Sequence, residues 1–237
     1  MTGAYYSATG NTFFVVDSRN TKLTDSTKEA VVLKYVDERD GVIFVEDHFM
    51  DYFNRDGKRA EFCGNGARTY VAFIHEITGE TKITFESYAG RIEGFVDGLY
   101  NVKMPPVNYH GSREFQGIKG EFLTVGVPHF VIEGDTEKLE WETLIPIRWE
   151  LNTNINVYKE IEPGKLRIRT FERGVEGETG ACGTGATATA WCYARGRKLL
   201  QVTLQANGGE LVVSFKEGNI YLGGGVERCS EVLQVQL

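Results

Sequence analysis

Two short segments of the sequence each place one cysteine directly before a glycine-rich turn. The first reads CGNGA from Cys63, and the second reads CGTGA from Cys182. A glycine-rich turn that enters a helix presents backbone N–H groups without intrahelical partners, and the positive end of the helix dipole attracts anions such as carboxylates. The same field favours the thiolate form of a cysteine. Each segment therefore predicts an acid/base sulfur beside a carboxylate-binding turn.

The two turns could act on one substrate if the halves of the chain face each other as pseudo-twofold copies. A carboxylate held at both helix starts would place its α-carbon between the sulfurs of Cys63 and Cys182. One thiolate would remove the α-proton and the opposite thiol would return a proton from the other face, while the N–H groups stabilise the charge that develops on the carboxylate. Such chemistry inverts a stereocentre, and it requires no pyridoxal cofactor.

The elements that must carry the first turn alternate between strands and helices. Capping residues ahead of an apolar pattern predict a short helix within 24–38, and the segment after Cys63 predicts a helix closed by Gly79. A hairpin that turns at NRDG leads into Cys63. The apolar or broken apolar runs that predict strands lie at 12–17, 41–47 and 82–104.

The second half of the chain repeats this order of elements. When Cys63 is set on Cys182 without gaps, helix falls on helix and the strand 83–90 falls on 202–209. The sequence therefore predicts an α+β fold of two pseudo-symmetric domains, each with a helix packed on a mostly antiparallel sheet. The PPV segment marks a boundary, which gives an N-terminal domain at 1–106 and a C-terminal domain at 107–225. The last strand, 226–237, could pair with either half, and we group it with the first.

Composition limits the classes of partner. The 237 residues carry a net charge of −7 and no basic stripe, which argues against a nucleic-acid partner. No apolar run approaches the roughly 20 residues that span a bilayer, and the N-terminus lacks signal-peptide features, so we expect a cytoplasmic protein with no membrane partner. The cysteines lack metal-ligand spacing, so no metal is expected. We interpret Cys192 and Cys229 as small buried apolar residues.

The chain resembles the diaminopimelate epimerase family over most of its length. The segments that carry this resemblance are SATGNTFFVVD, YFNRDGKRAEFCGNGAR, TVGVPHFV, TNINVYK and ERGVEGETGACGTGA. The resemblance implies that each domain is a curled sheet around a central helix. It also implies an isomerase that epimerises LL-2,6-diaminopimelate to the meso form without a cofactor, through two cysteines, in lysine and peptidoglycan precursor biosynthesis. The implied assembly is a homodimer.

The resemblance also assigns roles to single residues. Cys63 and Cys182 would be the two bases. His129 and Glu172 would complete the catalytic set, and together with Asn11 they would surround the reacting centre and its amino group. The other implied substrate-binding residues are Gly64, Asn65, Gly183 and Thr184, whose N–H groups would hold the reacting carboxylate, and Asn54, Asn154 and Arg173, which would hold the distal amino-acid end.

Other interpretations of these motifs remain open at this stage. Val127 stands where the family has asparagine, so a broader amino-acid racemase acting on lysine, ornithine or a similar substrate is the alternative. GTGATA also fits a dinucleotide-binding fingerprint. A cysteine hydrolase with His129 as its base would leave one cysteine motif without a role, and a non-enzymatic amino-acid-binding module would not explain two thiols.

Overall fold

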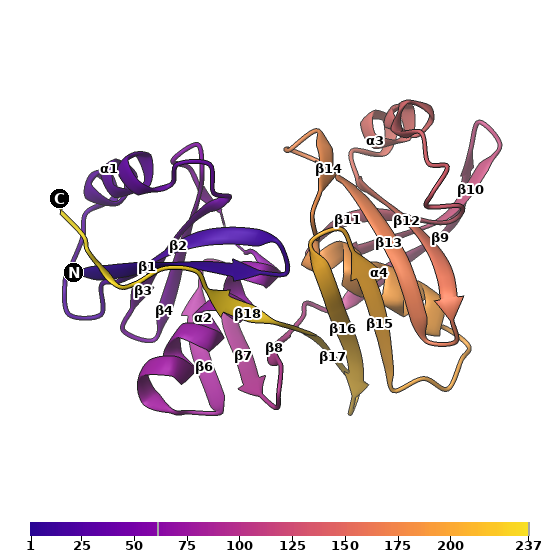
Figure 1. Ribbon diagram of the computed structural model, residues 1–237. Helices are drawn as coiled ribbons and strands as arrows, with labels where there is room; N and C mark the ends of the chain where they lie inside the picture. The colour runs from indigo at the N-terminus through magenta and orange to yellow at the C-terminus, as the bar shows by residue number, and fades with distance from the viewer. Residues whose placement is uncertain (61, 237) are drawn as a thin grey trace. The chain divides into compact units, whose positions relative to one another are not determined.

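The computed structural model describes residues 1–60 and 62–236 (Figure 1). The chain packs into two compact units, Met1–Val102 with Gly224–Leu237, and Lys103–Gly223. In each unit a sheet surrounds one buried helix, and a second helical segment packs against the same sheet.

The first unit holds the two helices α1 (Asp25–Tyr35) and α2 (Gly64–Thr78). The strands that begin in it are β1 (Thr2–Ala8), β2 (Asn11–Asp17), β3 (Gly41–Glu46), β4 (Phe49–Asn54), β5 (Arg59–Ala60), β6 (Lys82–Ser87), β7 (Gly90–Val96), β8 (Tyr100–Lys103), β18 (Val226–Arg228) and β19 (Leu233–Gln234). Antiparallel pairs join β1 to β2, β3 to β4 and β6 to β7, and parallel pairs join β2 to β3 and β4 to β6. The C-terminal strands β18 and β19 both pair with β1.

The second unit follows the same plan. Its helical segments are η1 (Trp141–Thr143), α3 (Ile145–Leu151) and α4 (Gly183–Ala194). Its strands are β9 (Val107–Phe115), β10 (Ile118–Val125), β11 (Val127–Glu133), β12 (Asn154–Glu162), β13 (Lys165–Glu172), β14 (Gly177–Thr179), β15 (Gln201–Ala206), β16 (Gly209–Lys216) and β17 (Asn219–Gly224).

The strand pairings show that the two units are copies of one topology. The antiparallel pair β1–β2, the parallel pair β2–β3 and the antiparallel pair β3–β4 correspond to β10–β11, β11–β12 and β12–β13. The parallel pair β4–β6 corresponds to β13–β15. Helix α2 precedes β6 just as α4 precedes β15. The predicted α+β fold of two pseudo-symmetric halves is confirmed.

The two central helices are buried because strands contact them on several sides. Helix α2 contacts β1, β3, β4, β6 and β7, and α4 contacts β10, β11, β12, β15 and β16 (Figure 1). The alternating alanines of α4, among them Ala186, Ala188 and Ala190, are fully buried and let the strands approach closely. Helix α2 ends at Gly79, whose φ of 76° is the left-handed conformation that glycine adopts without strain.

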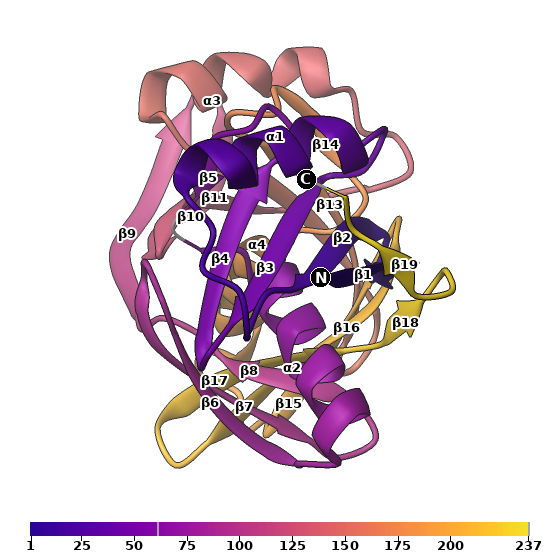
Figure 2. The same ribbon diagram turned by 90° about the vertical axis from the view of Figure 1, so that its left-hand side faces the viewer.

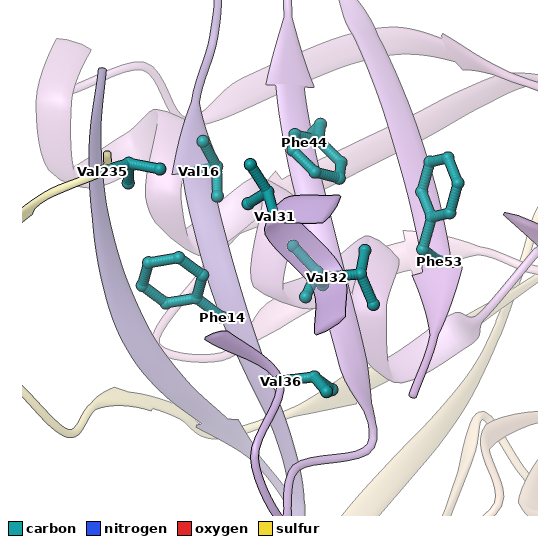
Figure 3. Close-up of a cluster of buried hydrophobic side chains, with 9 residues drawn as sticks. Phe14, Val16, Val31, Val32, Val36, Phe44, Phe53 and Val235 are labelled. Carbon is teal, nitrogen blue, oxygen red and sulfur yellow. The ribbon is translucent and has the colours of Figure 1, made fainter. Parts of the chain in front are cut away.

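Helix α1 packs against the strands of the first unit (Figure 2). The Thr24 side chain caps it by accepting a hydrogen bond from the Thr27 N–H at 3.2 Å. Figure 3 shows Val31 and Val32 of this helix among Phe14, Phe44 and other buried side chains of the cluster. Burying this apolar surface, at roughly 25 cal/mol per Å², stabilises the strands that lead to the central helix.

Strands β1 and β9 are among those that the sequence did not predict. Strand β1 contains Gly3 at a point where the neighbouring strand leaves no room for a side chain: a Cβ there would lie 2.5 Å from the Phe14 ring. Strand β9 is largely exposed, so its polar sequence shows no apolar stripe. Both strands are defined by their partners rather than by their own composition.

Candidate active site

Cys63 begins the central helix of the first unit. Its backbone is extended, with φ −138° and ψ 115°, and its sulfur accepts a hydrogen bond from the Gly66 N–H at 3.3 Å. The residue therefore occupies the N-cap, where serine, threonine, asparagine and aspartate are the usual acceptors. A thiol is a weak acceptor and a thiolate is a stronger one, so this position favours the charged sulfur.

Cys182 repeats this geometry in the second unit. Its backbone is extended, with φ −119° and ψ 113°, and its sulfur accepts from the Gly185 N–H at 3.4 Å. The Thr184 hydroxyl lies 3.5 Å from the same sulfur. Both cysteines thus hold their sulfurs at the positive ends of buried helices, where backbone N–H groups and the helix dipole favour negative charge.

A polar network supports the Cys63 turn. The Asn65 side chain donates to the Asn11 Oδ1 at the start of β2, and it accepts from the Arg68 guanidinium at 2.7 Å. Arg68 also donates to the Thr9 hydroxyl at 3.0 Å and to the Gly225 carbonyl at 3.2 Å. The structure therefore brings Asn11, Asn65 and Cys63 to one helix start.

Arg68 was not singled out by the sequence analysis. It is fully buried, and burial lowers its pKa to about 10, while its attraction to Cys63 acts in the opposite direction. A positive charge beside the sulfur is a second influence that favours the thiolate. The sequence itself offered one signal, a charged residue among the mostly small or apolar residues from Gly64 to Phe73. The structure shows that this whole run is buried.

The predicted residues of the second unit gather around the ends of β11, β12 and β13. His129 stands opposite Asn154 in the parallel β11–β12 pair. The Asn154 side chain accepts from the Arg173 N–H at 2.8 Å and donates to the Pro128 carbonyl at 3.1 Å. The Thr179 hydroxyl donates to Glu172 at 2.5 Å, which ties the end of β13 to the β14 segment before Cys182.

Two of the remaining predicted positions lie near turns. Asn54 ends β4 and is exposed, and its N–H donates to the Lys58 carbonyl at 2.8 Å in the hairpin. The Arg173 side chain donates to the Asn152 carbonyl at 3.2 Å.

Val127 begins β11 and pairs with Val125 across Gly126. An apolar residue therefore occupies the position for which the resemblance implies an amide.

His129 is held in a neutral form. It is fully buried, and burial, followed by the positive charge of Arg173, lowers its pKa to about 3. Its Nδ1 lies 3.0 Å from the Asn156 side-chain nitrogen. A histidine in this state can position or polarise a substrate but cannot act as a cation near neutral pH.

The other two cysteines differ from each other. Cys229 is exposed, so its interpretation as a buried apolar residue was wrong, because its segment lies at the surface beside β1. Burial raises the pKa of Cys192 to about 12, which makes that thiol a poor nucleophile.

Among the described helices, none is long and apolar enough to cross a bilayer.

Solved structures share this fold at low sequence identity. A phenazine biosynthesis protein of the PhzF family from Bacillus anthracis superposes with a TM-score of 0.79 at 15% identity, over 100% of this chain and 99% of that one. A hydroxyproline epimerase from Agrobacterium vitis superposes with a TM-score of 0.67 at 14% identity, over 99% and 90%. These likenesses establish the two-unit fold.

Relatives with similar sequences show which class of enzyme and which protein family the chain belongs to. A diaminopimelate epimerase from Thermotoga maritima is 42% identical over 95% of this chain and 99% of its own length, and one from Aquifex aeolicus is 34% identical over 94% and 93%. The chain is therefore an isomerase. The family model of diaminopimelate epimerase matches residues 3–108 and 122–228, and the chain belongs to that family.

The buried state of His129 predicts a specific acid sensitivity. Its pKa is lowered from 6.5 to about 3, so below pH 6.5 the unfolded chain takes up a proton that the folded chain does not. The free energy of unfolding should therefore fall by about 1.4 kcal/mol per pH unit between these values because of this one group. When urea unfolding is measured from pH 7 to pH 4, the free energy of unfolding should fall less steeply for His129→Gln than for the wild type. His48→Gln, at an exposed histidine, is the matched control, and equal slopes for wild type and His129→Gln would contradict this assignment.

The equivalent glycines of the two turns should respond differently to alanine. A Cβ on Gly185 would lie 2.2 Å from the Asn156 Oδ1, whereas a Cβ on Gly66 would meet its nearest atom at 3.4 Å. We expect Gly185→Ala to lower the free energy of unfolding by about 1–3 kcal/mol through overpacking. Gly66→Ala should leave it unchanged or raise it by up to about 1 kcal/mol, because alanine favours helix. Urea titration of both variants checks this, and equal stabilities would show that Gly185 is not tightly packed.

Proposed function

We propose that this protein converts LL-2,6-diaminopimelate to the meso form by moving one proton off, and another onto, a single α-carbon. The observation that carries the proposal is the repeated cap: a cysteine sulfur accepts the N–H three residues later at equivalent points of both units. The names of the relatives supply the substrate, since those with 42% and 34% identity are diaminopimelate epimerases.

The backbone turns supply the carboxylate site in this proposal. Helix geometry leaves the first N–H groups outside the intrahelical ladder. Those of Gly64 and Asn65 in one unit, and of Gly183 and Thr184 in the other, hold the reacting carboxylate. Negative charge grows on this carboxylate as the α-proton leaves, so fixed N–H dipoles stabilise the transition state more than the bound substrate.

The two sulfurs carry out the proton transfers. The thiolate of one cysteine, Cys63 or Cys182, takes the α-proton and becomes a thiol. The thiol of the other donates its proton to the opposite face of the carbon and becomes a thiolate. The stereocentre is inverted, and the two sulfurs have exchanged protonation states. Asn11, His129 and Glu172 surround the reacting centre, with the Glu172 carboxylate suited to the substrate ammonium group.

The distal end of the substrate determines specificity. In this proposal Asn54, Asn154 and Arg173 bind the second amino-acid end, and the Arg173 guanidinium pairs with its carboxylate. Val127 offers no hydrogen bond there, so the distal stereocentre is read less tightly. The relatives' names favour diaminopimelate over the broader racemase alternative.

The cellular setting is proposed from the family likeness. We place the enzyme in the cytoplasm, in lysine and peptidoglycan precursor synthesis, as a homodimer that works without a cofactor. We also propose domain limits at 1–106 and 107–225, with 226–237 belonging to the first domain.

Cysteine replacement and a substrate comparison test the proposal together. Cys63→Ala and Cys182→Ala should each lower the rate of inversion of LL-diaminopimelate by at least about 10³-fold, because each removes one obligatory proton carrier. The wild type should turn over LL-diaminopimelate far faster than L-lysine when both are followed by chiral chromatography. Full inversion by either alanine variant would overturn the two-base mechanism, and faster turnover of L-lysine would support the broader racemase.

A further inference from the structure

Asn156 of β12 lies at a junction of four elements in the second unit. It is fully buried. Its side chain contacts His129 on β11, Thr170 on β13 and Gly185 on α4. Contacts on three other elements hold this buried amide in place, so its oxygen and its nitrogen face different chemical groups.

The approach of Gly185 determines which way the amide points, because the Thr170 hydroxyl can donate or accept and fits either orientation. In the structure that hydroxyl donates to the Asn156 Oδ1 at 3.1 Å. The same oxygen faces the Cα of Gly185, since a Cβ built there would lie 2.2 Å from it. A Cα–H group is tolerated by an oxygen at close range, whereas an amide N–H would find no acceptor there. Asn156 therefore directs its oxygen toward Thr170 and Gly185 and its nitrogen toward His129.

The orientation of this amide sets the tautomer of His129. The Asn156 Nδ2 donates to the His129 Nδ1 at 3.0 Å, so Nδ1 is the acceptor nitrogen of a neutral ring. The single ring hydrogen must then lie on Nε2. That nitrogen is buried, and the described residues supply no hydrogen-bond partner for it. A buried N–H donor without a protein partner is costly unless a ligand accepts its hydrogen bond.

We propose that Asn156 is a positioning residue that fixes His129 as the Nε2–H tautomer, so that His129 donates a hydrogen bond to an acceptor oxygen of the bound amino acid. This inference rests on the proposed function for the identity of the ligand. An ammonium group has no lone pair to accept such a bond, so the acceptor is the substrate carboxylate. His129 then adds a side-chain donor to the backbone N–H groups that stabilise developing negative charge.

The tautomer can be measured on the substrate-free protein. In ¹⁵N-histidine-labelled protein, two-bond ¹H–¹⁵N correlations distinguish the protonated from the unprotonated ring nitrogen. We expect Nδ1 of His129 to be unprotonated and Nε2 to be protonated in the wild type. A protonated Nδ1 would overturn the inference, whatever the activity of the enzyme. This readout keeps the inference separate from the proposed reaction, which fails instead if the wild type does not invert diaminopimelate.

Substitution of Asn156 tests its role. Asn156→Leu has a similar shape but removes the donor, so His129 should lose its single tautomer, and kcat/KM should fall on the order of 10²-fold. Asn156→Asp reverses the direction of the hydrogen bond to His129, because an ionised carboxylate can only accept from Nδ1–H. The ring hydrogen should therefore move to Nδ1, with a comparable loss of activity. Thr189→Val is the matched control, since it removes another fully buried polar group that lies on α4. In this variant the His129 tautomer and the activity should match those of the wild type.

The outcomes separate a positioning role from a structural one. A variant that keeps the wild-type tautomer and loses activity only in proportion to its folded fraction would show that Asn156 merely stabilises the unit. Folded Asn156→Leu with an unchanged tautomer and unchanged kcat/KM would also overturn the inference. If neither Asn156 variant folds, the wild-type tautomer decides the question.

Discussion

A helix start leaves backbone N–H groups without intrahelical partners, and in each unit of this protein a cysteine sulfur accepts one of them. Cys63 and Cys182 have the extended backbone that is usual for an N-cap residue. The φ and ψ of such a residue lie in the β region, and the next residue begins the helix. The effect of the helix dipole on the sulfur is larger where the helix start is shielded from water, because solvent and salt screen an exposed dipole. The surrounding strands provide this shielding in both units.

The two copies support this common interaction with different polar residues. Behind Cys63 a buried guanidinium, Arg68, braces Asn65 and places positive charge near the sulfur. Behind Cys182 the neutral pair Asn156 and His129 lies beside the helix start, with the Asn156 Oδ1 against Gly185. A repeated fold can therefore support the same sulfur cap with different polar neighbours.

Local patterns predicted the parts of the fold that depend on local chemistry. The strands at 12–17 and 41–47 and the helix that ends at Gly79 were expected correctly, because their apolar runs and caps act within a few residues. Strand β1 was missed because the glycine at position 3 is required by the Phe14 ring on the neighbouring strand, a contact that the local sequence does not reveal. Arg68 and Asn156 were missed for the same reason: their importance comes from burial among residues distant in sequence. The doubled cysteine motif was recognisable because each copy carries its own glycines.

The central claim is that two sulfurs, rather than one, exchange protons with the substrate carbon. The most direct measurement follows LL-diaminopimelate in D₂O during the first few per cent of conversion, with the label located by mass spectrometry after chiral separation. Because the donating thiol has equilibrated with solvent while the other sulfur holds the abstracted proton, the account predicts one deuterium in each molecule of newly formed epimer and none in the remaining substrate. Product that retains the original proton, or substrate that gains deuterium as fast as product forms, would indicate a single base and contradict the account.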